Sequence, residues 1–424
     1  MGDDAGATRA WVLHPDIPNS NSTREPALAL EEAVSLAHAL PDLDVAGGDV
    51  VRLRAVHPGT LFGKGKLAEL KARFEAEEIE LVLIDGPVSP VQQRNLEKEW
   101  GLKLLDRTGL ILEIFSDRAA TREGVLQVEM AALSYQRTRL VRAWTHLERQ
   151  RGGLGFVGGP GETQLEADRR AIDDQLVRLR RQLSKVIKTR TLHRAARAKV
   201  PFPIVALVGY TNAGKSTLFN RLTGAEVMAK DMLFATLDPT MRRIELPGGG
   251  PEIILSDTVG FISDLPTELV AAFRATLEEV LEADLICHVR DISHPETEEQ
   301  SRDVAVIMES LGVLESTPQI EVWNKIDRLD ADALSAVQTR AARSEDVMAI
   351  SAVSGAGVDD LAQAITDALA GTTQEEELLL GYDMGRQRAW LYERALIEGE
   401  TQDEDGYRLT VRWNAMQKAQ FEGL

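Results

Sequence analysis

The chain has 424 residues, two to three times the usual length of one domain, so we expect two large domains and a small third one. Hydrophobic residues make up 44% of it, but the longest apolar runs, IVALVG and DLICHV, are far shorter than the roughly 20 residues needed to cross a bilayer. The net charge of −19 argues, as an average, against a nucleic-acid partner. Because the first residues also lack the pattern of a signal peptide, we expect a soluble cytoplasmic protein without a transmembrane segment.

Cysteine and histidine usage limits the possible chemistry. A single cysteine, Cys287, excludes an internal disulfide and a zinc site built from cysteines, and its apolar surroundings predict a buried thiol. The seven histidines contain no pair at helical i, i+4 spacing. The sequence therefore predicts no transition-metal site.

The first 120 residues predict a leader followed by an α/β domain. Residues 1–25 are rich in Gly, Asp, Asn, Ser and Pro, which indicates a flexible leader around a short strand at 10–14. Helical patterns at 26–40, 65–79 and 89–101 then alternate with strand patterns at 49–56, 80–86 and 102–106. The third helix should begin on a cap at Ser89 and end at Gly101. This alternation predicts an N-terminal α/β domain at 26–120, with a mostly parallel sheet that can include the strand at 10–14.

The sequence FGKGK, residues 62–66, has two interpretations. A Gly-Lys pair before a helix can hold a phosphate of RNA or of a second nucleotide, but this stretch lacks the longer loop of a nucleotide site. A turn at the start of a helix is the favoured interpretation. Whether the N-terminal domain binds a nucleotide of its own stays open.

Two heptad patterns predict a long helical hairpin at 121–199. The apolar positions are Leu126, Met130, Leu133, Leu140, Trp144 and Leu147, and then Leu165, Ile172, Leu176, Leu179, Leu183 and Val186. Two such helices bury their apolar seams by folding back on each other, which places the Gly-rich stretch 151–161 at the hairpin tip. The pair Pro160-Gly161 is expected to set a turn there, and a plain interdomain loop is the alternative.

The hairpin is also the basic part of the chain. Between Arg137 and Lys199, sixteen Lys and Arg residues stand against six Asp and Glu residues, a net charge of +10 that leaves −29 for all other residues. Each such residue alone is explained by a solvated helix face, but their sum favours RNA. The residues expected to contact RNA are Arg151, Gly158, Gly159, Gly161, Arg178, Arg181, Lys185 and Lys188.

A second α/β pattern, at 200–370, carries a nucleotide-binding motif. Residues 209–216, GYTNAGKS, follow an apolar strand and precede a helix, which is the context of a phosphate loop. Glycines let the loop N–H groups surround the phosphates, and the helix N-terminus adds the positive end of its dipole. We expect Lys215 to reach the β- and γ-phosphates and Ser216 to bind Mg²⁺.

Three further motifs indicate guanine nucleotides. Asp257 in LSDTVG is placed to hold Mg²⁺ through water, and the N–H of Gly260 to contact the γ-phosphate. Asp327 in EVWNKID can accept hydrogen bonds from guanine N1 and its 2-amino group, which adenine does not offer in that arrangement. ISAVSG brings a backbone N–H, at Ser351 or Ala352, to guanine O6.

The predicted contacts with GTP or GDP come from five segments. They are Gly209, Tyr210, Thr211, Asn212, Ala213, Gly214, Lys215, Ser216 and Thr217; Phe234, Ala235, Thr236, Leu237 and Asp238; Asp257, Thr258, Val259 and Gly260; Asn324, Lys325, Ile326 and Asp327; and Ser351, Ala352 and Val353. The residues expected to act in hydrolysis are Lys215, Thr236, Gly260 and Asn212.

Two residues bear on the rate of hydrolysis. Phe261 stands where many GTPases have the glutamine that orients the attacking water, so we expect slow intrinsic hydrolysis. Asn212 corresponds to an asparagine that coordinates K⁺ beside the β/γ bridge in several related GTPases. Stimulation by K⁺ is one hypothesis, and a role of Asn212 in shaping the loop is the other.

These motifs resemble one family, the HflX-type GTPases, translation-factor-related proteins that act on the ribosome. HPGTLFGKGKLAEL is similar to the N-terminal signature of that family, GGPGETQLE to its linker signature, and FATLDPT, DTVGFI and HVRDISHP to parts of its GTPase domain. The resemblance covers nearly the whole chain after residue 25. FATLDP also resembles the stretch in which translation-factor-like GTPases carry the threonine that completes the Mg²⁺ shell, which favours Thr236 over Thr240.

The resemblance implies an N-terminal α/β domain with a hairpin, a Ras-like GTPase domain at 200–370 and a small α+β domain at 371–424. It also implies binding to the large (50S) ribosomal subunit, with the hairpin and its Gly-rich loop directed at rRNA, and splitting or rescue of 70S ribosomes. We further expect a monomer whose hydrolysis of GTP is stimulated by the ribosome. One departure is Arg290, where the family usually has an apolar residue. A charge there suggests that the end of this strand is open to water or to a partner.

Two other functions stay open at this stage. A tRNA-modification GTPase shares the phosphate-loop asparagine, but it would resemble this chain only in the GTPase domain and would have a reactive cysteine near its C-terminus, whereas Cys287 is followed by 137 residues without one. A GTP-switched scaffold would bind a protein through the hairpin, but such a partner does not require the charge of +10.

Overall fold

The chain divides into two compact units, residues 1–244 with 252–358 and residues 245–251 with 359–424. The structure, a computed structural model, describes residues 7–17, 24–150, 160–197, 202–224, 234, 240–246, 251–263, 278–281, 283–313, 317–370, 374–394, 396–403, 406–413, 417–418 and 421. The boundary after residue 358 precedes the boundary predicted at residue 370.

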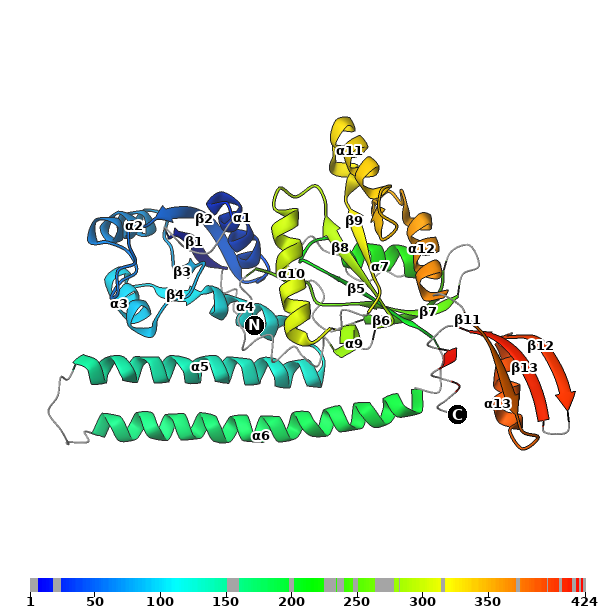
Figure 1. The fold of residues 1–424 in the computed structure, drawn as a ribbon. Coiled ribbons are helices and arrows are strands. Elements are labelled where there is room, and N and C mark those ends of the chain that lie inside the picture. The colour runs from blue at the N-terminus through cyan, green and yellow to red at the C-terminus, as the bar shows by residue number, and fades with distance from the viewer. Residues whose placement is uncertain are drawn as a thin grey trace, which may run out of the picture. The chain divides into compact units, whose positions relative to one another are not determined.

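The first unit begins with a four-stranded parallel sheet in the order β2-β1-β3-β4 (Figure 1). Its elements are β1 (Thr8–Asp16), α1 (Pro26–Ala37), β2 (Leu43–Arg52), α2 (Lys64–Ala76), β3 (Leu81–Ile84), α3 (Pro90–Trp100), β4 (Lys103–Asp106) and α4 (Arg107–Arg118). The predicted parallel sheet is confirmed. The two ends of α3 are also as expected, because Ser89 and Gln92 form a reciprocal capping box and Gly101 ends the helix in the left-handed conformation at φ 73°.

Two details of this sheet differ from the prediction. β1 pairs with both β2 and β3, so the sheet includes the strand expected at 10–14, which lies centrally and extends over residues 8–16. β2 begins at Leu43, earlier than the predicted residue 49, and so includes Gly47. Gly47 lies against the ring of Trp11, where a Cβ atom would meet the ring at 2.7 Å. Glycine, which is unfavourable in an isolated strand, is needed here for this close contact. Helix α4 was not predicted, and it follows β4 directly because Asp106 caps it by accepting from the N–H of Gly109.

The hairpin consists of α5 (Arg122–Gln150) and α6 (Pro160–Arg197), which lie side by side in Figure 1. Leu126, Leu176 and Leu179 of the predicted seams are buried, and Arg137 pairs with Asp173 across the two helices at 2.6 Å. The turn predicted at Pro160-Gly161 was wrong, since α6 begins at Pro160. Proline fits the first position of a helix because its fixed φ is helical and no N–H is required there.

A six-stranded sheet in the order β10-β9-β8-β5-β7-β6 follows in the first unit. Its elements are β5 (Ile204–Gly209), α7 (Lys215–Thr223), β6 (Thr240–Glu245), β7 (Glu252–Asp257), α9 (Glu278–Leu281), β8 (Leu285–Asp291), α10 (Thr297–Leu311), β9 (Gln319–Asn324), the 3₁₀ helix η1 (Ile326–Arg328), α11 (Ala331–Ala341) and β10 (Val347–Ala349). The pairs β5·β7, β5·β8, β8·β9 and β9·β10 are parallel. The carboxyl ends of these strands therefore meet at one edge, where α/β sheets bind ligands.

Strand β8 carries Cys287 and Arg290, both buried. The thiol of Cys287 is fully buried as predicted, and burial raises its pKa to about 12. Arg290 is only 6% exposed and pairs with Glu298 and Glu321 at 2.9 Å each, so the expectation that this strand end is open to water was wrong. An arginine is tolerated at this buried position because two carboxylates neutralise it.

The second unit contains helix α12 and a three-stranded antiparallel sheet in the order β11-β13-β12. Its elements are α12 (Val358–Ala370), β11 (Gln374–Leu380), α13 (Gly385–Glu393), β12 (Ile397–Asp403) and β13 (Gly406–Trp413). Its core includes Leu391, Leu409, Val411 and Trp413. This is the α+β arrangement that the sequence predicts. Throughout the described parts of both units, no helix is long and apolar enough to span a membrane.

Candidate nucleotide-binding site

The phosphate loop connects β5 to α7, and two glycines allow its path. Gly214 has a left-handed φ of 96°, and a Cβ atom there would meet the amide nitrogen of Asn324 at 2.2 Å. At Gly209 a Cβ atom would meet the carbonyl oxygen of Val289, on the neighbouring strand β8, at 2.1 Å. Any larger residue would push the loop away from β8 and β9, so these glycines are required by close packing.

Lys215 is the first residue of α7, and its side chain turns back into the loop. Its Nζ atom donates to the carbonyl oxygens of Gly209 at 3.0 Å and Tyr210 at 2.8 Å. Burial lowers the pKa of Lys215 to about 8, and the nearby charge of Lys325 acts in the same direction, whereas Asp257 acts against it. An anion bound in the loop would relieve this cost, which makes the buried ammonium group a strong phosphate ligand.

Ser216 and Asp257 meet below the loop and could hold a divalent cation. The Ser216 hydroxyl donates to Oδ2 of Asp257 at 2.7 Å, and the Asp257 side chain comes from the carboxyl end of β7. A hydroxyl and a carboxylate are oxygen ligands of the kind that Mg²⁺ prefers. Among the described residues, no group of three or more His, Cys, Asp or Glu side chains is placed to bind a metal.

The segment after Asp257 lies directly on the phosphate loop. Thr211 donates its N–H to Phe261 O at 2.7 Å, and Phe261 donates its N–H to Gly209 O at 3.1 Å. Gly260 is so close that a Cβ atom would lie 2.8 Å from Cα of Thr211 and 3.0 Å from Nζ of Lys215. Gly260 thus lies next to Lys215, the residue that the sequence predicts to contact the γ-phosphate.

Asn324, at the end of β9, joins two loops of the site. Its amide nitrogen donates to Ala213 O at 2.8 Å, and its amide oxygen accepts from the N–H of Ala352 at 2.9 Å. Asp327, the residue that the sequence predicts to recognise guanine, lies in η1 with an exposed side chain. Ser351 and Ala352 are buried, whereas Val353 is exposed.

The structure places the other predicted residues as follows. Lys325 pairs with Asp291 at 2.7 Å and has a left-handed φ of 67°. Thr258 is fixed by its hydroxyl, which donates to Leu207 O at 2.7 Å. Phe234 is buried against the ring of Phe115, at 4.6 Å between centroids, so its side chain belongs to the core. Residues Ala235, Thr236, Leu237, Asp238, Arg151, Gly158 and Gly159 lie outside the described residues, and Thr240 is the first residue of β6.

Two groups of residues at the site were missed by the sequence analysis. Arg221 on α7 donates through Nε to Ala352 O at 2.5 Å and so holds the loop that is to meet the base. Glu32 and Arg107, from the first sheet and its helices, reach Tyr210 and Ser263 beside the phosphate loop. Arg221 is a single arginine on a helix and belongs to no sequence motif, so its role could not be predicted. The contacts of Glu32 and Arg107 join residues that are far apart in the sequence, which no local pattern indicates.

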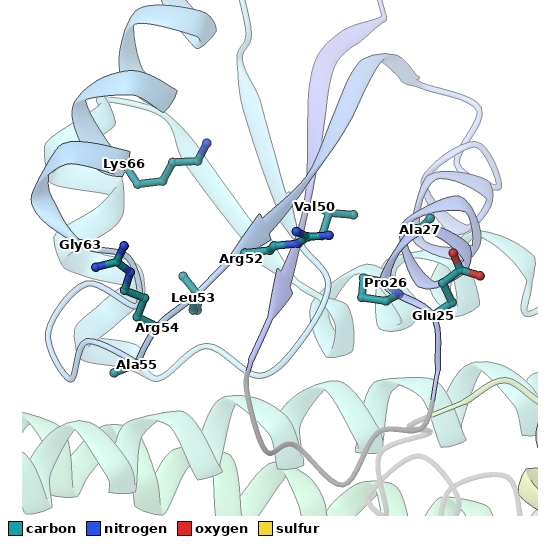
Figure 2. Close-up of a pocket in the computed structure, with 10 residues that line it drawn as sticks. All are labelled: Glu25, Pro26, Ala27, Val50, Arg52, Leu53, Arg54, Ala55, Gly63 and Lys66. Carbon is teal, nitrogen blue, oxygen red and sulfur yellow. The ribbon is translucent and has the colours of Figure 1, made fainter.

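The structure has two hollows that bear on the predicted sites. One of about 290 Å³ borders the phosphate loop at Tyr210, Thr211 and Asn212. The other, of about 840 Å³, is drawn in Figure 2 and includes Arg52, Arg54, Gly63 and Lys66. Gly63 is the N-cap of α2, which agrees with a helix start at FGKGK, and Lys66 pairs with Glu69 at 2.7 Å.

A phosphate loop after β5, an aspartate at the end of β7 and an Asn-Lys-x-Asp sequence after β9 define a P-loop GTPase. Four family models match the chain: "GTP-binding GTPase N-terminal" at residues 28–116, "GTP-binding GTPase Middle Region" at 118–197, "50S ribosome-binding GTPase" at 204–325 and "HflX C-terminal domain" at 336–423. The chain is 48% identical to GTPase HflX of Magnetococcus marinus, over 90% of this chain and 87% of that one. It is 47% identical to GTPase HflX of Escherichia coli, over 83% and 82%. The chain therefore belongs to the HflX family of GTPases.

Among solved structures, a GTP-binding protein of Sulfolobus solfataricus in complex with GDP is 23% identical, with a TM-score of 0.45, and covers 85% of this chain and 99% of that one. Family membership establishes that the chain binds and hydrolyses GTP and carries a ribosome-binding GTPase domain. The family models match residues before, within and after the GTPase domain. They do not support the tRNA-modification alternative, which accounts for the GTPase domain alone.

Proposed function

We propose that this GTPase is a cytoplasmic monomer that binds the 50S ribosomal subunit and splits or rescues 70S ribosomes, and that its hairpin and Gly-rich loop contact rRNA. The observation that carries this proposal is the row of exposed cations on α6. Arg178, Arg180, Arg181, Lys185 and Lys188 all have exposed side chains. Phosphate groups of RNA are the partner that such a row fits best.

The hairpin also has the length and the anchorage for such a role. The 38 residues of α6 correspond to about 57 Å at 1.5 Å per residue. On α5, Tyr135 donates to Asp106 at 2.6 Å and Arg139 pairs with the same carboxylate at 3.0 Å. The helix continues beyond these contacts to Gln150, so the anchor lies in its first two thirds and leaves the loop end to a partner.

For the nucleotide site we propose that Mg²⁺ is held by Ser216, by Thr236 and, through water, by Asp257. The bound cation would neutralise charge on the β- and γ-phosphates. Lys215 and the loop N–H groups bind the phosphates, and the N–H of Gly260 contacts the γ-phosphate. Because the side chain of Phe261 is buried and apolar, it orients no water, and intrinsic hydrolysis is slow until the ribosome stimulates it.

K⁺ stimulation is a separate proposal. Asn212 has an exposed side chain, a left-handed φ of 58° and a place beside the hollow that borders the phosphate loop. We expect faster turnover in KCl than in NaCl, and Asn212→Ala should remove the difference. Equal turnover in both salts for the unchanged protein would leave Asn212 the role of shaping the loop.

Sedimentation tests the ribosomal function. With a non-hydrolysable GTP analogue, the protein should migrate with 50S subunits in a sucrose gradient, and the 70S peak should decrease. The double variant Arg178→Glu/Arg181→Glu should lose this migration. Arg302→Glu/Arg343→Glu is the matched control, because it reverses two exposed charges on α10 and after α11. Equal binding of both variants would overturn the proposed RNA contact, and binding insensitive to salt between 50 and 200 mM would favour a protein partner.

The Gly-rich tip is tested by replacing Gly158, Gly159 and Gly161 with alanine. We expect intact folding and GTP binding together with reduced splitting of 70S ribosomes, because added methyl groups keep the backbone away from RNA. If the melting temperature of the isolated protein falls instead, the loop has a structural role.

A further inference from the structure

Tyr210, the second residue of the phosphate loop, makes two hydrogen bonds that the nucleotide-binding motif does not explain. Its hydroxyl donates to Glu32 of α1 at 2.5 Å and accepts the N–H of Ser263 at 2.7 Å. Ser263 follows Phe261 by two residues, in the segment that lies on the phosphate loop. One phenol group therefore connects the loop, this segment and the first sheet.

Two arginines, the buried Arg107 and the partly buried Arg24, complete the cluster around Glu32. Arg107, the first residue of α4, pairs with Glu32 at 2.5 Å and Asp85 at 2.6 Å, and donates to Ser263 O at 3.0 Å. Arg24 pairs with Glu32 at 2.9 Å and Glu296 at 3.0 Å. Removing these charges from water is costly, so each guanidinium group in the cluster is paired with carboxylates.

The charge states in the cluster are fixed by these contacts. Burial favours the neutral form of Glu32, but the charges of Arg107 and Arg24 lower its pKa below the usual range. Burial and the neighbouring carboxylate raise the pKa of Tyr210, so its hydroxyl keeps its proton and donates it to Glu32. The same hydroxyl oxygen accepts a hydrogen bond from the N–H of Ser263.

The consequence for the reaction lies at Gly260. Phe261 is held to the loop by two backbone hydrogen bonds and Ser263 by Tyr210, so Gly260 is kept against Thr211 and Lys215. This is the place where the N–H of Gly260 can meet a γ-phosphate. A nucleoside diphosphate such as GDP has no γ-phosphate to contact this N–H.

We propose that Tyr210 is a positioning residue for GTP hydrolysis: acting through Ser263, it holds Gly260 where the γ-phosphate binds, and Glu32 and Arg107 hold its hydroxyl in place. The arrangement contributes to binding and turnover of GTP and leaves GDP binding nearly unchanged. The first sheet thus takes part in the chemistry of the GTPase sheet through one hydroxyl group.

The test is Tyr210→Phe in the full chain, which removes the hydroxyl and keeps the ring. We expect kcat to fall about tenfold and the affinity for a non-hydrolysable GTP analogue to fall about as much, with the Kd for GDP within about twofold of the unchanged protein. Glu32→Gln should give the same selective loss. The double variant should lose little more than either single one, because both act through one contact.

Tyr135→Phe is the matched control, since Tyr135 also donates from a partly buried hydroxyl to a carboxylate, Asp106, at 2.6 Å, but its hydroxyl contacts Asp106 and Arg139 and not the phosphate loop. Its kcat and nucleotide affinities should stay unchanged. Unchanged kcat in Tyr210→Phe would overturn the proposal. So would an equal loss of GDP and analogue affinity, which means general damage to the loop. If Tyr210→Phe does not fold, Glu32→Gln decides by the same measurements, because it weakens the contact that holds the Tyr210 hydroxyl in place.

Discussion

The side-chain amide of Asn324 donates a hydrogen bond to the carbonyl oxygen of Ala213 at 2.8 Å, which couples the loop predicted to recognise the base to the phosphate loop. The same amide accepts from the N–H of Ala352 at 2.9 Å. Three loops from β5, β9 and β10 therefore share one side chain. A change at this residue should disturb the base and the phosphate contacts together.

Asn324→Ala should weaken GDP and GTP binding by similar factors. The change leaves Ala213 O and the N–H of Ala352 without their buried partner, at a cost of about 1–3 kcal/mol, or roughly 5- to 150-fold in Kd. Fluorescent nucleotide titration measures both affinities. Asn95→Ala is the control, since Asn95 also donates to a backbone carbonyl, Gly59 O, at 2.8 Å but in the first sheet. Selective loss of one nucleotide would contradict this account.

Asp327→Asn should shift the base preference from guanine toward xanthine. A carboxylate accepts from both guanine N1 and the 2-amino group, whereas an amide presents a donor that suits the carbonyl oxygen of xanthine. Competition between GTP and xanthosine triphosphate measures the shift. Asp330→Asn is the control, because Asp330 is exposed nearby but caps α11. If guanine selectivity persists in Asp327→Asn, another residue recognises the base.

Nucleotide binding should take up a proton at alkaline pH. The pKa of Lys215 is lowered to about 8 in the nucleotide-free protein, and phosphates beside the ammonium group should raise it. At pH 9 the free protein has mostly neutral Lys215, so GDP binding requires protonation and becomes weaker as pH rises; at pH 7 the lysine is already charged. Calorimetric titration in two buffers of different ionisation enthalpy should therefore give different heats at pH 9 and equal heats at pH 7. Equal heats at both pH values would show that the lysine stays charged.

The same shift has a consequence for stability. The unfolded lysine keeps its proton up to its ordinary pKa of 10.5, so between about pH 8 and that value the unfolded chain binds more protons than the folded one. The contribution of Lys215 to stability is therefore least favourable below pH 8 and improves as pH rises through this window. Lys215→Met should flatten this part of the pH profile in denaturant unfolding and should abolish GTP binding.

Gly260→Ala should impair GTP hydrolysis more than GDP binding. The added Cβ would approach Thr211 Cα to 2.8 Å and Lys215 Nζ to 3.0 Å, so the segment must move away from the γ-phosphate position. We expect a decrease in kcat of at least about tenfold, measured by phosphate release. Gly63→Ala is the control, because a Cβ there meets nothing within 4 Å. Unchanged turnover in Gly260→Ala would mean that the segment has room to adjust.

Much of the fold could be predicted because its signals are local. The cap at Ser89, the end of α3 at Gly101 and the buried seam at Leu176 and Leu179 each depend on residues within a few positions. Helix α4 was missed because it follows β4 without a loop, and β2 was placed too late because Gly47 and Gly48 are unfavourable in an isolated strand. The interpretation of Arg290 was wrong for a similar reason, since its partner Glu321 lies on the neighbouring strand and is paired with it only by the fold.

The sequence by itself determined the nucleotide chemistry, because each motif follows a strand directly and parallel strands bring their carboxyl ends to one edge. The motifs alone therefore place Lys215, Ser216, Asp257 and Asn324 at this edge of the sheet. Only the tertiary structure decided how the first sheet joins this site. Tyr210 and Glu32 are separated by 178 residues, and nothing in the local sequence of either predicts their hydrogen bond. Burying an acid beside two arginines is tolerated only when the packed chain brings the carboxylate and both guanidinium groups together, and that depends on the complete fold.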